Sequence, residues 1–506
     1  MRYLGTMTRL ASSSTVPSPV APSPDRVLIW FRSDLRLTDN PAVVAARGAK
    51  EALFVFIDET NDGLRPRGGA SRWWLHHSLE SLGRSLAERG QKLLFFKGDS
   101  RQIIPALAKR CSAGRVVWNR RYGQPERDMD AGIKATLKAD GITAESFNGA
   151  LLFEPMEIRS KAGGPMRVFT PFWRACRALR EPDQPVAAPE RLPPAAATTP
   201  TDSLSLSDLA LLPTRPDWAG GLRASWQPGE TGAAGRLADF LGGPLRDYGE
   251  NRNRPDYVST SRLSPHLAFG EISPRQIWHA TEAARMAGQA AGSADDIEKF
   301  FSELGWREFS HHLLFHFPTL PKTNYQPKFD SFPWEENPEG LAAWQRGRTG
   351  YPIVDAGMRE LWETGFMHNR VRMIVASFLI KHLMIDWRLG ENWFWDTLCD
   401  ADPANNAASW QWVAGSGADA APYFRIFNPV TQGEKFDPDG DYVRKFVPEL
   451  ARLPDKFIHK PWEAPHPIRQ AAGIVLGQTY PAPVVQHEHA RQRALAAFQS
   501  LSGEPL

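Results

Sequence analysis

The sequence contains few cysteines, and none of them has the spacing of a metal or redox motif. The three are Cys111, Cys176 and Cys399 in a chain of 506 residues, which excludes a disulfide framework and the usual structural zinc sites. No apolar run reaches the roughly 18 residues that a membrane-spanning helix needs. We therefore expect a soluble protein of a reducing compartment, in the cytoplasm and associated with the nucleoid if the source is bacterial.

The chain also lacks a strong excess of either charge. It has 60 Lys and Arg against 57 Asp and Glu, which leaves a formal charge of +3. This balance excludes a polycationic coat protein and an acidic disordered chain, so any nucleic-acid surface must be a local patch. Tyrosine is scarce too, with 9 residues against 18 tryptophans, and the excess of tryptophan requires an explanation.

The N-terminal segment, residues 1–24, has no acidic residue and is rich in Ser, Pro and Ala. Such a composition cannot bury a core, and we expect a disordered tail. An acid-free, Ser-rich start with arginine is also found in transit peptides, so organellar targeting stays open, although no clear amphipathic period supports it.

Short apolar runs alternate with helical periodicity from residue 25 onward. The runs are 26–31, 51–58, 91–98, 115–120 and 141–147. This alternation predicts α/β architecture, with a doubly wound parallel sheet in a Rossmann-like domain over 25–150. The first run is not followed by GxGxxG and the chain has no GxxxxGK[ST], so a dinucleotide fingerprint and a P-loop are not supported. A ligand can still bind where the strand order reverses.

The second half of the chain has a different pattern. Residues 151–230 contain a stretch rich in Pro, Ala, Ser and Thr at 184–218, and we interpret them as an interdomain linker. Beyond residue 230 the strand pattern disappears and helical periodicity takes its place. We expect an all-helical domain over 231–485 and a C-terminal tail over 486–506, with one helical segment near 484–500.

Several polar segments of this helical half could carry chemistry. Residues 256–265 place four Ser or Thr hydroxyls and an arginine before a helical run, which suits a phosphate, although an ordinary N-cap explains them too. Glu303, Trp306 and Arg307 share one helix face and could hold a flat polar ligand, while a surface ion pair beside a core Trp is the plainer alternative. The histidines downstream match no ligand spacing, so we expect no metal.

Two more segments combine charge, amides and aromatic rings. Residues 368–372 open a long apolar helix with two arginines, and Arg425 and Lys435 lie in a polar segment. Cations and rings suit a single-stranded or flipped nucleotide, whereas a solvated helix end explains the same residues. Residues 400–412 hold two acids, two Asn and two Trp; they could meet a ring nitrogen or a sugar, or simply form an Asx-rich turn.

Taken together, these segments resemble the photolyase/cryptochrome family. The resemblance rests on VLIWFRSDLRLTDNPAV, TSRLSP, GEISPRQIW, ELGWREF, WQRGRTGYPIVDAGMREL, MHNRVRMIVASFLIKHLMIDWR and NNAASWQWVAGSGADAAPYFRIFNPVTQGEKFD. It implies an α/β antenna domain, a long linker, and a helical domain that binds FAD in a U-shaped conformation.

The resemblance also implies roles for individual residues. FAD contacts are expected from Tyr248, Thr260, Ser261, Arg262, Leu263, Ser264, Asn369, Arg372, Asp400, Asp402 and Asn406. The catalytic residues would be Glu303, Met373 and Asn406, and the residues that meet DNA or line the pocket entrance would be Arg252, Trp306, Arg307, Asn369, Arg370, Arg425 and Gln432. An electron-transfer chain would run through Trp410, Trp387 and Trp334, which partly explains the excess of tryptophan.

Single positions help to separate the branches of the family. A (6-4) photolyase has two histidines where this chain has Asn369 and Met373, and the DASH branch has Gln at the second of these positions. Plant cryptochromes carry Asp, and many animal ones Cys, in place of Asn406. Signalling cryptochromes also tend to carry long C-terminal tails, whereas only 60 residues follow Phe446.

The resemblance therefore implies a cyclobutane pyrimidine dimer photolyase of class I or class III, a monomer that acts on UV-damaged DNA. Reduced FAD, excited by light, would lend one electron to a flipped-out dimer. A blue-light cryptochrome with little repair activity is the alternative, and a nucleotide-binding protein without photochemistry is a more distant one. Residues 118–122 and Glu126 follow the fourth strand, where relatives bind a second chromophore; we favour a folate (MTHF) over a deazaflavin.

Overall fold

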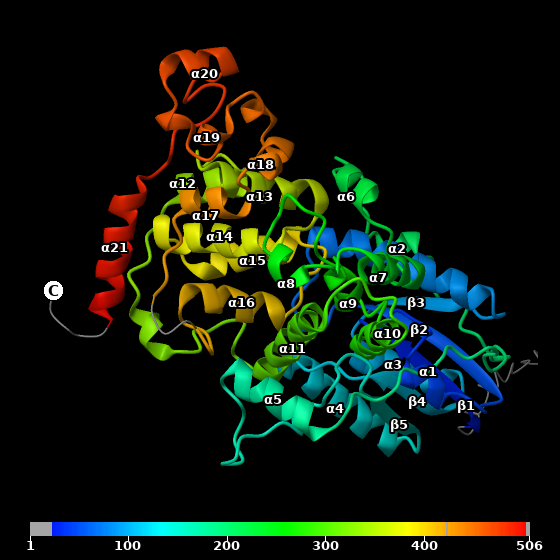
Figure 1. Cartoon of the computed structure of the whole chain (residues 1–506). Helices are drawn as coiled ribbons and strands as arrows, with labels where there is room; N and C mark the ends of the chain where they lie inside the picture. The colour runs from blue at the N-terminus through cyan, green and yellow to red at the C-terminus, as the bar shows by residue number, and fades with distance from the viewer. Residues whose placement is uncertain (1–22, 421–423, 502–506) are drawn as a thin grey trace, which may run out of the picture.

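The computed structural model describes residues 23–420 and 424–501, so the predicted tail over 1–24 lies almost wholly outside the described residues. Five strands form one parallel sheet in the order β3-β2-β1-β4-β5 (Figure 1). They are β1 (Ser23–Phe31), β2 (Glu51–Glu59), β3 (Leu93–Gly98), β4 (Ala113–Asn119) and β5 (Thr143–Phe147). The doubly wound parallel sheet predicted from the sequence is confirmed.

Successive side chains of a strand point to opposite faces of the sheet, and helices cover both faces, so both sets of side chains are buried. The helices that follow its strands are α1 (Pro41–Ala45), α2 (Gly69–Ala87), α3 (Ser100–Arg110) and α4 (Gln124–Ala139). In β1, Val27 and Ile29 belong to a core shared with α1 and α2, whereas Leu28 and Trp30 belong to a core shared with α3 and α4. This two-sided burial explains why the strands appear in the sequence as continuous apolar runs.

The segment after β5, interpreted as a linker, holds more structure than its composition indicated. Helix α5 (Phe169–Leu179) packs against α11, and the Phe169 ring stacks on Trp306 with 3.8 Å between centroids. Further along, Ala195 and Leu204 form isolated bridges to β2 and β3. The chain thus crosses the sheet before it enters the helical half through α6 (Gly220–Ser225).

The rest of the described chain is helical, and it has no β-strand after β5. Its α-helices are α7 (Glu230–Gly242), α8 (Tyr248–Asn251), α9 (Ser264–Ala268), α10 (Pro274–Met286), α11 (Ala294–His316), α12 (Pro338–Gln345), α13 (Pro352–Thr364), α14 (Asn369–Ser377), α15 (Trp387–Thr397), α16 (Asn405–Ala414), α17 (Pro429–Phe436), α18 (Asp441–Phe446), α19 (Asp455–Ile458), α20 (His466–Ala472) and α21 (His487–Ser500). Short 3-10 turns are η1 (Ser207–Leu209), η2 (Pro327–Ser331), η4 (Pro448–Leu450) and η5 (Pro461–Glu463), and η3 (Phe378–His382) is a π-helical turn.

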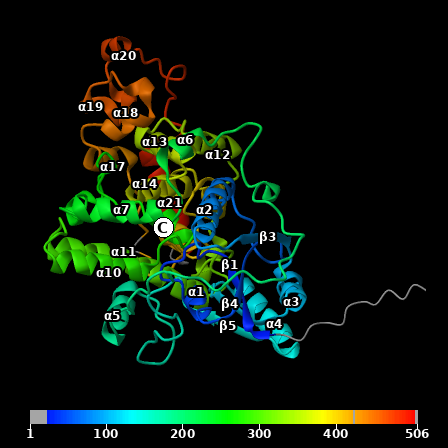
Figure 2. The ribbon, with the colours of Figure 1, turned by 90° about the vertical axis from the view of Figure 1, so that its right-hand side faces the viewer.

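Local capping fixes the helices that matter for the site. Ser293 and Asp296 form a capping box at the start of α11, each side chain accepting a hydrogen bond from the backbone N–H of the other. Asp386 caps α15 by accepting from the N–H of Arg388. Helices α11, α14, α15 and α16 then pack together, while α18 to α20 lie at the end of the molecule far from the sheet (Figures 1 and 2).

The last helix, α21, occupies most of the segment that we expected to be a C-terminal tail. It packs against the π-helical turn η3, where the Nε2 of His382 lies 2.8 Å from the Nδ1 of His487. Its Ala494 and Ala497 join a small apolar core with Phe329, Phe332 and other residues. The described part of the C-terminal segment is therefore docked on the helical half.

Candidate functional site

Two cavities, each of about 550 Å³, lie in the described part of the chain. One is enclosed by helices of the second half, and we call it the helix cavity. The other lies at the carboxyl ends of the strands, and we call it the sheet cavity. The helix cavity brings together sixteen of the residues singled out in the sequence: Tyr248, Arg252, Ser261, Leu263, Ser264, Glu303, Trp306, Arg307, Asn369, Arg370, Arg372, Met373, Asp400, Asp402, Asn406 and Trp410.

A charged pair forms one wall of the helix cavity. The guanidinium of Arg372 donates to both carboxylate oxygens of Asp400 at 3.1 and 2.8 Å, and the hydroxyl of Ser264 donates to the same carboxylate at 2.6 Å. The pairing of Arg372 with Asp400 predicted from the sequence is confirmed. Because Ser264 turns to Asp400, the hydroxyls before α9 do not act as a simple N-cap, and no side chain caps that helix.

Asp402 lies where the two cavities approach each other and contributes to the lining of both. Its Oδ1 accepts from the N–H groups of Ala404 and Asn405 and so starts α16. Burial alone would raise the pKa of this carboxyl, but His311 and Arg307 beside it hold the pKa well below its usual range. The wall between the cavities therefore carries a fixed negative charge.

A neutral imidazole lies behind the arginines of α14. His368 caps this helix by accepting from the N–H of Arg370. Burial, together with the charges of Arg370 and Arg372, lowers the pKa of His368 to about 3. The N-terminus of α14 thus presents its arginines to the cavity without a third positive charge behind them.

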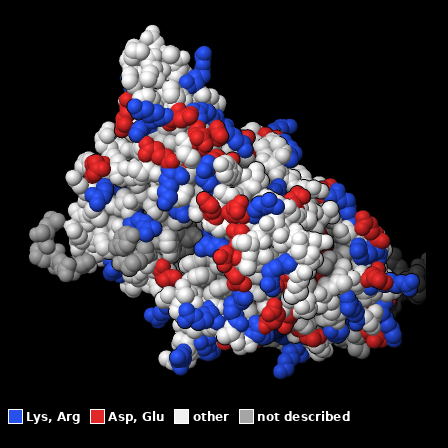
Figure 3. Space-filling view, viewed as in Figure 1, with Lys and Arg blue, Asp and Glu red and all other residues white. Residues whose placement is uncertain are grey.

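The mouth of the helix cavity combines an acid, aromatic rings and cations. Glu303 is paired with Arg252, and Arg370 donates to the side-chain oxygen of Asn253 at 2.8 Å. The Trp306 ring is held by its stack on Phe169. Figure 3 shows a hollow between α8, α11 and α16 with Lys and Arg side chains close to it, while charges of both signs cover the rest of this face.

Four residues predicted for cofactor or DNA contact do not line the helix cavity. Thr260 is not part of its wall. The side chain of Arg262 turns away instead and lies between the rings of Trp226 and Phe366, at 4.6 and 4.7 Å from their centroids. Its backbone has a positive φ of 51°, which turns the loop before α9; a contact between this residue and FAD stays a prediction. Arg425 and Gln432 lie outside the wall as well.

Arg307 was expected to meet DNA, and the structure places it differently. It donates to the carbonyl of Ala150 at 2.8 Å, with a side chain only 12% exposed, and lies near Glu308 rather than Glu303. Its guanidinium is therefore tied to the α/β half, while the residue still lines the helix cavity, and a contact with DNA stays a prediction. The shared helix face of Glu303 and Arg307 therefore does not become an ion pair, because Arg252 takes that place.

The three tryptophans predicted for electron transfer belong to one core. Trp410 lines the helix cavity and is 2% exposed, Trp387 is fully buried, and Trp334 is partly buried at the edge of the same core. The series therefore leads from the cavity toward the surface. The indole N–H of Trp387 donates to Asn324, whereas that of Trp410 has no hydrogen-bond partner among the residues that the structure describes.

Sequence reasoning missed the residue that holds Asn406. The amide nitrogen of Asn406 donates to the carboxylate of Glu391 at 2.7 Å and to the backbone carbonyl of the same residue at 3.1 Å. Glu391 is 15 positions away on a different helix, so no local spacing reveals the contact. A charged residue beside the aromatic residues of ENWFW is expected at an exposed position of a helix, but the side chain of Glu391 is only 4% exposed.

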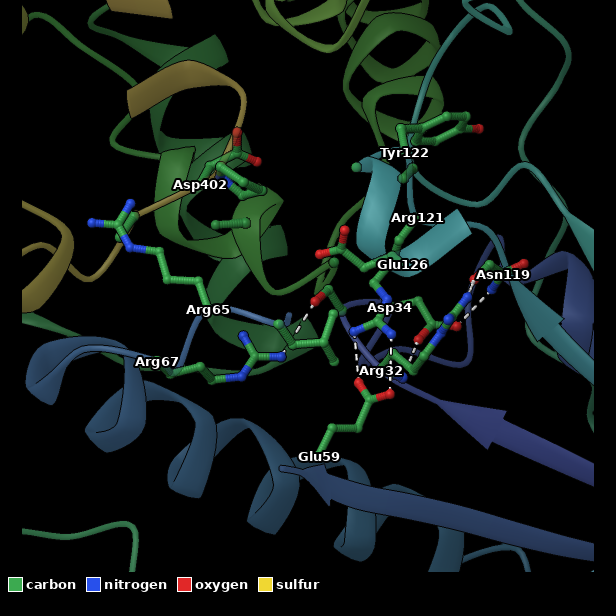
Figure 4. A pocket seen from close by; sticks show the side chains of 18 of the residues that line it. Arg32, Asp34, Glu59, Arg65, Arg67, Asn119, Arg121, Tyr122, Glu126 and Asp402 are labelled. Atoms are coloured by element: carbon green, nitrogen blue, oxygen red, sulfur yellow. Dashed lines mark hydrogen bonds and ion pairs between the residues drawn. The ribbon is translucent and has the colours of Figure 1, made fainter. Parts of the chain in front are cut away.

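The sheet cavity lies at the carboxyl ends of β1, β2 and β4, where the strand order reverses. Figure 4 shows the arginines that line it, among them Arg121, which is paired with Glu59 at 2.6 and 3.1 Å. Arg67 is half-buried and forms no ion pair within the described residues, and the loss of contact with water lowers its pKa. Tyr122 and Glu126, singled out after the fourth strand, belong to this wall.

The histidines of α11 serve the packing of this region. His312 accepts from the N–H of Met166 at 3.0 Å, and His316 contacts the carbonyl of Pro155. In the described ranges, no group of three or more His, Cys, Asp or Glu is placed to hold a metal ion. None of the helices there combines the length and the apolar character needed to cross a membrane.

Comparison with known proteins agrees with this geometry. Residues 27–191 match the family model described as DNA photolyase, and residues 300–500 match the one described as the FAD binding domain of DNA photolyase. A deoxyribodipyrimidine photo-lyase of Agrobacterium fabrum is 54% identical over 476 residues, which cover 94% of this chain and 98% of that one. The chain belongs to the photolyase/cryptochrome family. Its helical half is accordingly an FAD-binding domain.

Solved structures of family members are similar throughout. A bacterial class III photolyase from Agrobacterium tumefaciens superposes with a TM-score of 0.91 at 53% identity, covering 97% of this chain and all of that one. An archaeal photolyase from Sulfolobus tokodaii, solved with two FAD molecules, has a TM-score of 0.77 at 28% identity over 94% of this chain and 100% of that one. Cryptochromes are among the relatives as well.

Proposed function

We propose that this protein repairs cyclobutane pyrimidine dimers in UV-damaged DNA with the energy of light. The observation that carries the proposal is the helix cavity, whose wall brings together the three residues expected to meet the damaged bases with three expected to meet FAD: Glu303, Trp306, Met373, Arg372, Asp400 and Asn406. The similarity to photolyases over nearly the whole chain supports it. Of the two classes left open by the sequence, the likeness to a class III structure favours class III.

The donor set of the helix cavity fits FAD. Ser261 and Arg372 offer hydrogen-bond donors for phosphate and ring oxygens, and Asp400, which is paired with Arg372, can accept from a ring N–H or a sugar hydroxyl. Tyr248, Leu263 and Asn369 complete the wall around it. When bound, FAD supplies the photochemistry: one electron passes to the dimer in the light and returns after the cyclobutane ring opens.

The chain itself binds and orients the damaged bases. The flipped dimer enters between rings and cations at the mouth, where Trp306 offers a stacking plate and Arg252 and Arg370 offer charge to the phosphates. Glu303 exchanges its pairing with Arg252 for a hydrogen bond to the damaged base. Flipping costs less at a dimer than at a normal pair, because the lesion already weakens stacking.

The decisive experiment follows thymine dimers in an ultraviolet-irradiated oligonucleotide. Reduced, FAD-loaded protein should remove them in blue or near-ultraviolet light and not in the dark, and Glu303→Ala should slow repair by about tenfold or more, since it removes a hydrogen bond to the reacting base. Glu298→Ala removes an exposed carboxylate from the same helix outside the cavity wall, and it serves as the control. If FAD is bound and reducible but no dimer disappears, the photoreceptor alternative replaces repair.

A second chromophore in the sheet cavity is the next part of the proposal. Arg67 has no ion-pair partner in the described part of the chain and lines the cavity with Arg121 and Glu126. This set suits a ligand that carries carboxylates at one end and a polar ring at the other. A folate has that chemistry, and we favour it over a deazaflavin. Mass spectrometry of the chromophores released from natively purified protein identifies the ligand, and Arg67→Met should reduce the folate content while leaving the FAD content unchanged.

UV-damaged DNA is the proposed partner, bound by the chain as a monomer in the cytoplasm or nucleoid. Light scattering of the purified protein, alone and with a dimer-containing oligonucleotide, measures the stoichiometry. Binding should weaken with rising salt, because it relies on a local group of arginines rather than on the small net charge.

A further inference from the structure

Asn406 is held by a relay that begins in the other half of the molecule. Arg65, in the loop between β2 and α2, donates to both carboxylate oxygens of Glu391 at 2.7 and 2.8 Å. One of these two oxygens, Oε1 of Glu391, also accepts from the amide nitrogen of Asn406 at 2.7 Å. The order is therefore guanidinium, carboxylate, amide, and then the helix cavity that Asn406 lines.

The arginine is fixed in this place by more than one contact. Its guanidinium lies over the ring of Trp395 at 4.1 Å and also donates to the side-chain oxygen of Asn392 at 2.6 Å. The indole of Trp395 donates back to the carbonyl of Pro66 at 2.7 Å. Figure 4 shows the Arg65 side chain pointing away from the pair of Glu59 and Arg121, so it serves the helical half although it starts in the α/β half.

The carboxylate decides which end of the amide faces the cavity. Both acceptors that meet the amide of Asn406, the carbonyl and the carboxylate of Glu391, require N–H groups. A reversed amide would place its oxygen against these two oxygens and lose both hydrogen bonds. The Asn406 oxygen is consequently the atom left for a ligand. It can accept a hydrogen bond from the N5–H group of a flavin, which is present only when the flavin is reduced.

We propose that Arg65 and Glu391 are positioning residues that orient the Asn406 amide and thereby favour the reduced flavin. This inference rests on the proposed function, because it takes Asn406 as the group facing N5. The plainer reading, an ion pair that only fastens the two halves together, makes no demand on the orientation of the amide. The two differ in the redox equilibrium of the bound flavin.

The test uses full-length, FAD-loaded protein and measures FAD content and the midpoint potential of the bound flavin. In Glu391→Gln the new side chain has only one oxygen, and this oxygen turns to the guanidinium of Arg65. The N–H₂ group of the new side chain then faces Asn406, and the Asn406 amide must reverse so that its oxygen can accept from it. We expect the relative affinity for reduced flavin to fall about tenfold, which is about 30 mV more negative for a two-electron couple. The double variant Arg65→Met with Glu391→Gln frees the new oxygen to accept from Asn406 and should return the potential toward the wild-type value.

Two further variants complete the experiment. Arg65→Met alone, at a side chain 31% exposed, leaves an unbalanced carboxylate next to Asn406 and should also shift the potential to more negative values; it carries the test if Glu391→Gln does not fold. Arg110→Met breaks another bidentate arginine–carboxylate pair, with Asp202 on the surface, and should leave the potential unchanged.

The outcomes separate this proposal from the one that it rests on. Single variants that retain FAD and keep the wild-type potential would overturn the positioning role while leaving repair untouched. A double variant no closer to wild type than Glu391→Gln would overturn it too. Wild-type protein that binds no FAD would overturn the proposed function itself.

Discussion

Lys381 is a cation placed in the core of the helical half. Its side chain lies in the π-helical turn η3, is 3% exposed, and donates to the carbonyl of Arg425 while facing the ring of Phe424. Burial, reinforced by the charge of Arg425, lowers the pKa of Lys381 to about 7. An amine that is neutral in the folded state is still a donor, so the hydrogen bond persists above this pH.

The lowered pKa makes stability depend on pH in a defined direction. Between pH 7 and about 10 the unfolded chain binds the proton on Lys381 and the folded chain does not, so unfolding costs more free energy as pH rises. Relative to Lys381→Met, the wild type should gain on the order of 3 kcal/mol between pH 7 and pH 10. Urea unfolding of both proteins at several pH values measures this, and a difference that stays constant with pH would contradict it.

For individual residues, the sequence could predict contacts between groups whose chemistry matches. It could not predict contacts that form only because the folded chain brings distant residues together. The pairing of Arg372 with Asp400 could be predicted through the resemblance, because opposite charges at a cofactor site attract each other. The relay from Arg65 through Glu391 could not, since it joins residues that only tertiary packing brings together. Likewise the hydrogen bond from Arg307 to the carbonyl of Ala150 could not be predicted from the sequence.

At the scale of the element, α15 is built around close contact with α16. Gly390 faces the indole of Trp410, and a Cβ atom placed there would lie 2.2 Å from one ring carbon of Trp410 and 2.6 Å from Leu379. Because Gly390 has no side chain, the Trp410 ring can lie between α15 and the helix cavity.

Gly390→Ala should therefore destabilise the protein by about 1–3 kcal/mol through overpacking. It should also displace the Trp410 ring and slow the light-driven reduction of bound FAD, measured under constant illumination with an external reductant. Gly235→Ala is the matched control: this glycine is exposed within α7 and has nothing within 4 Å of the added carbon, so it should stabilise by about 0.5–1 kcal/mol. Equal effects of the two substitutions would contradict the packing argument.

Elements were predictable where periodicity is strong and long. The five strands and the helix over 294–316 follow the apolar patterns closely. Helix α5 was missed because it lies in a segment whose Pro-rich second part dominates the composition, although its own apolar face is strong enough to pack on α11. The π-helical turn η3 was not foreseen either, because residues 374–385 are apolar at nearly every position and a shift in helical phase is not visible in such a run.

At the scale of the whole molecule, buried polar contacts join the two halves. Glu271, between α9 and α10, accepts from the indole N–H of Trp74 in α2 at 3.0 Å and contacts His266 with its other oxygen. The guanidinium of Arg36 donates to the carbonyls of Gly270 and Gly149 at 2.8 and 2.6 Å. These groups are almost inaccessible to water, so each depends on its partner in the other half.

Glu271→Leu should lower the free energy of unfolding by about 3 kcal/mol, because it leaves a buried indole N–H and an imidazole without their acceptor. Glu271→Gln keeps one acceptor oxygen and should cost clearly less. Denaturant unfolding followed by circular dichroism and by release of FAD measures both. Similar losses for the two variants would show that shape rather than hydrogen bonding determines this contact.

The position of Arg65 has a consequence for anyone who divides the chain. The helical half contains all the residues that line the helix cavity, and a shortened gene encoding it alone would look like a self-sufficient flavin module. Yet such a fragment would lack the guanidinium that balances Glu391, as well as Trp74 and Arg36 at the seam. In chimeras assembled from different relatives, the loop that carries Arg65 and helix α15 should therefore come from the same parent protein.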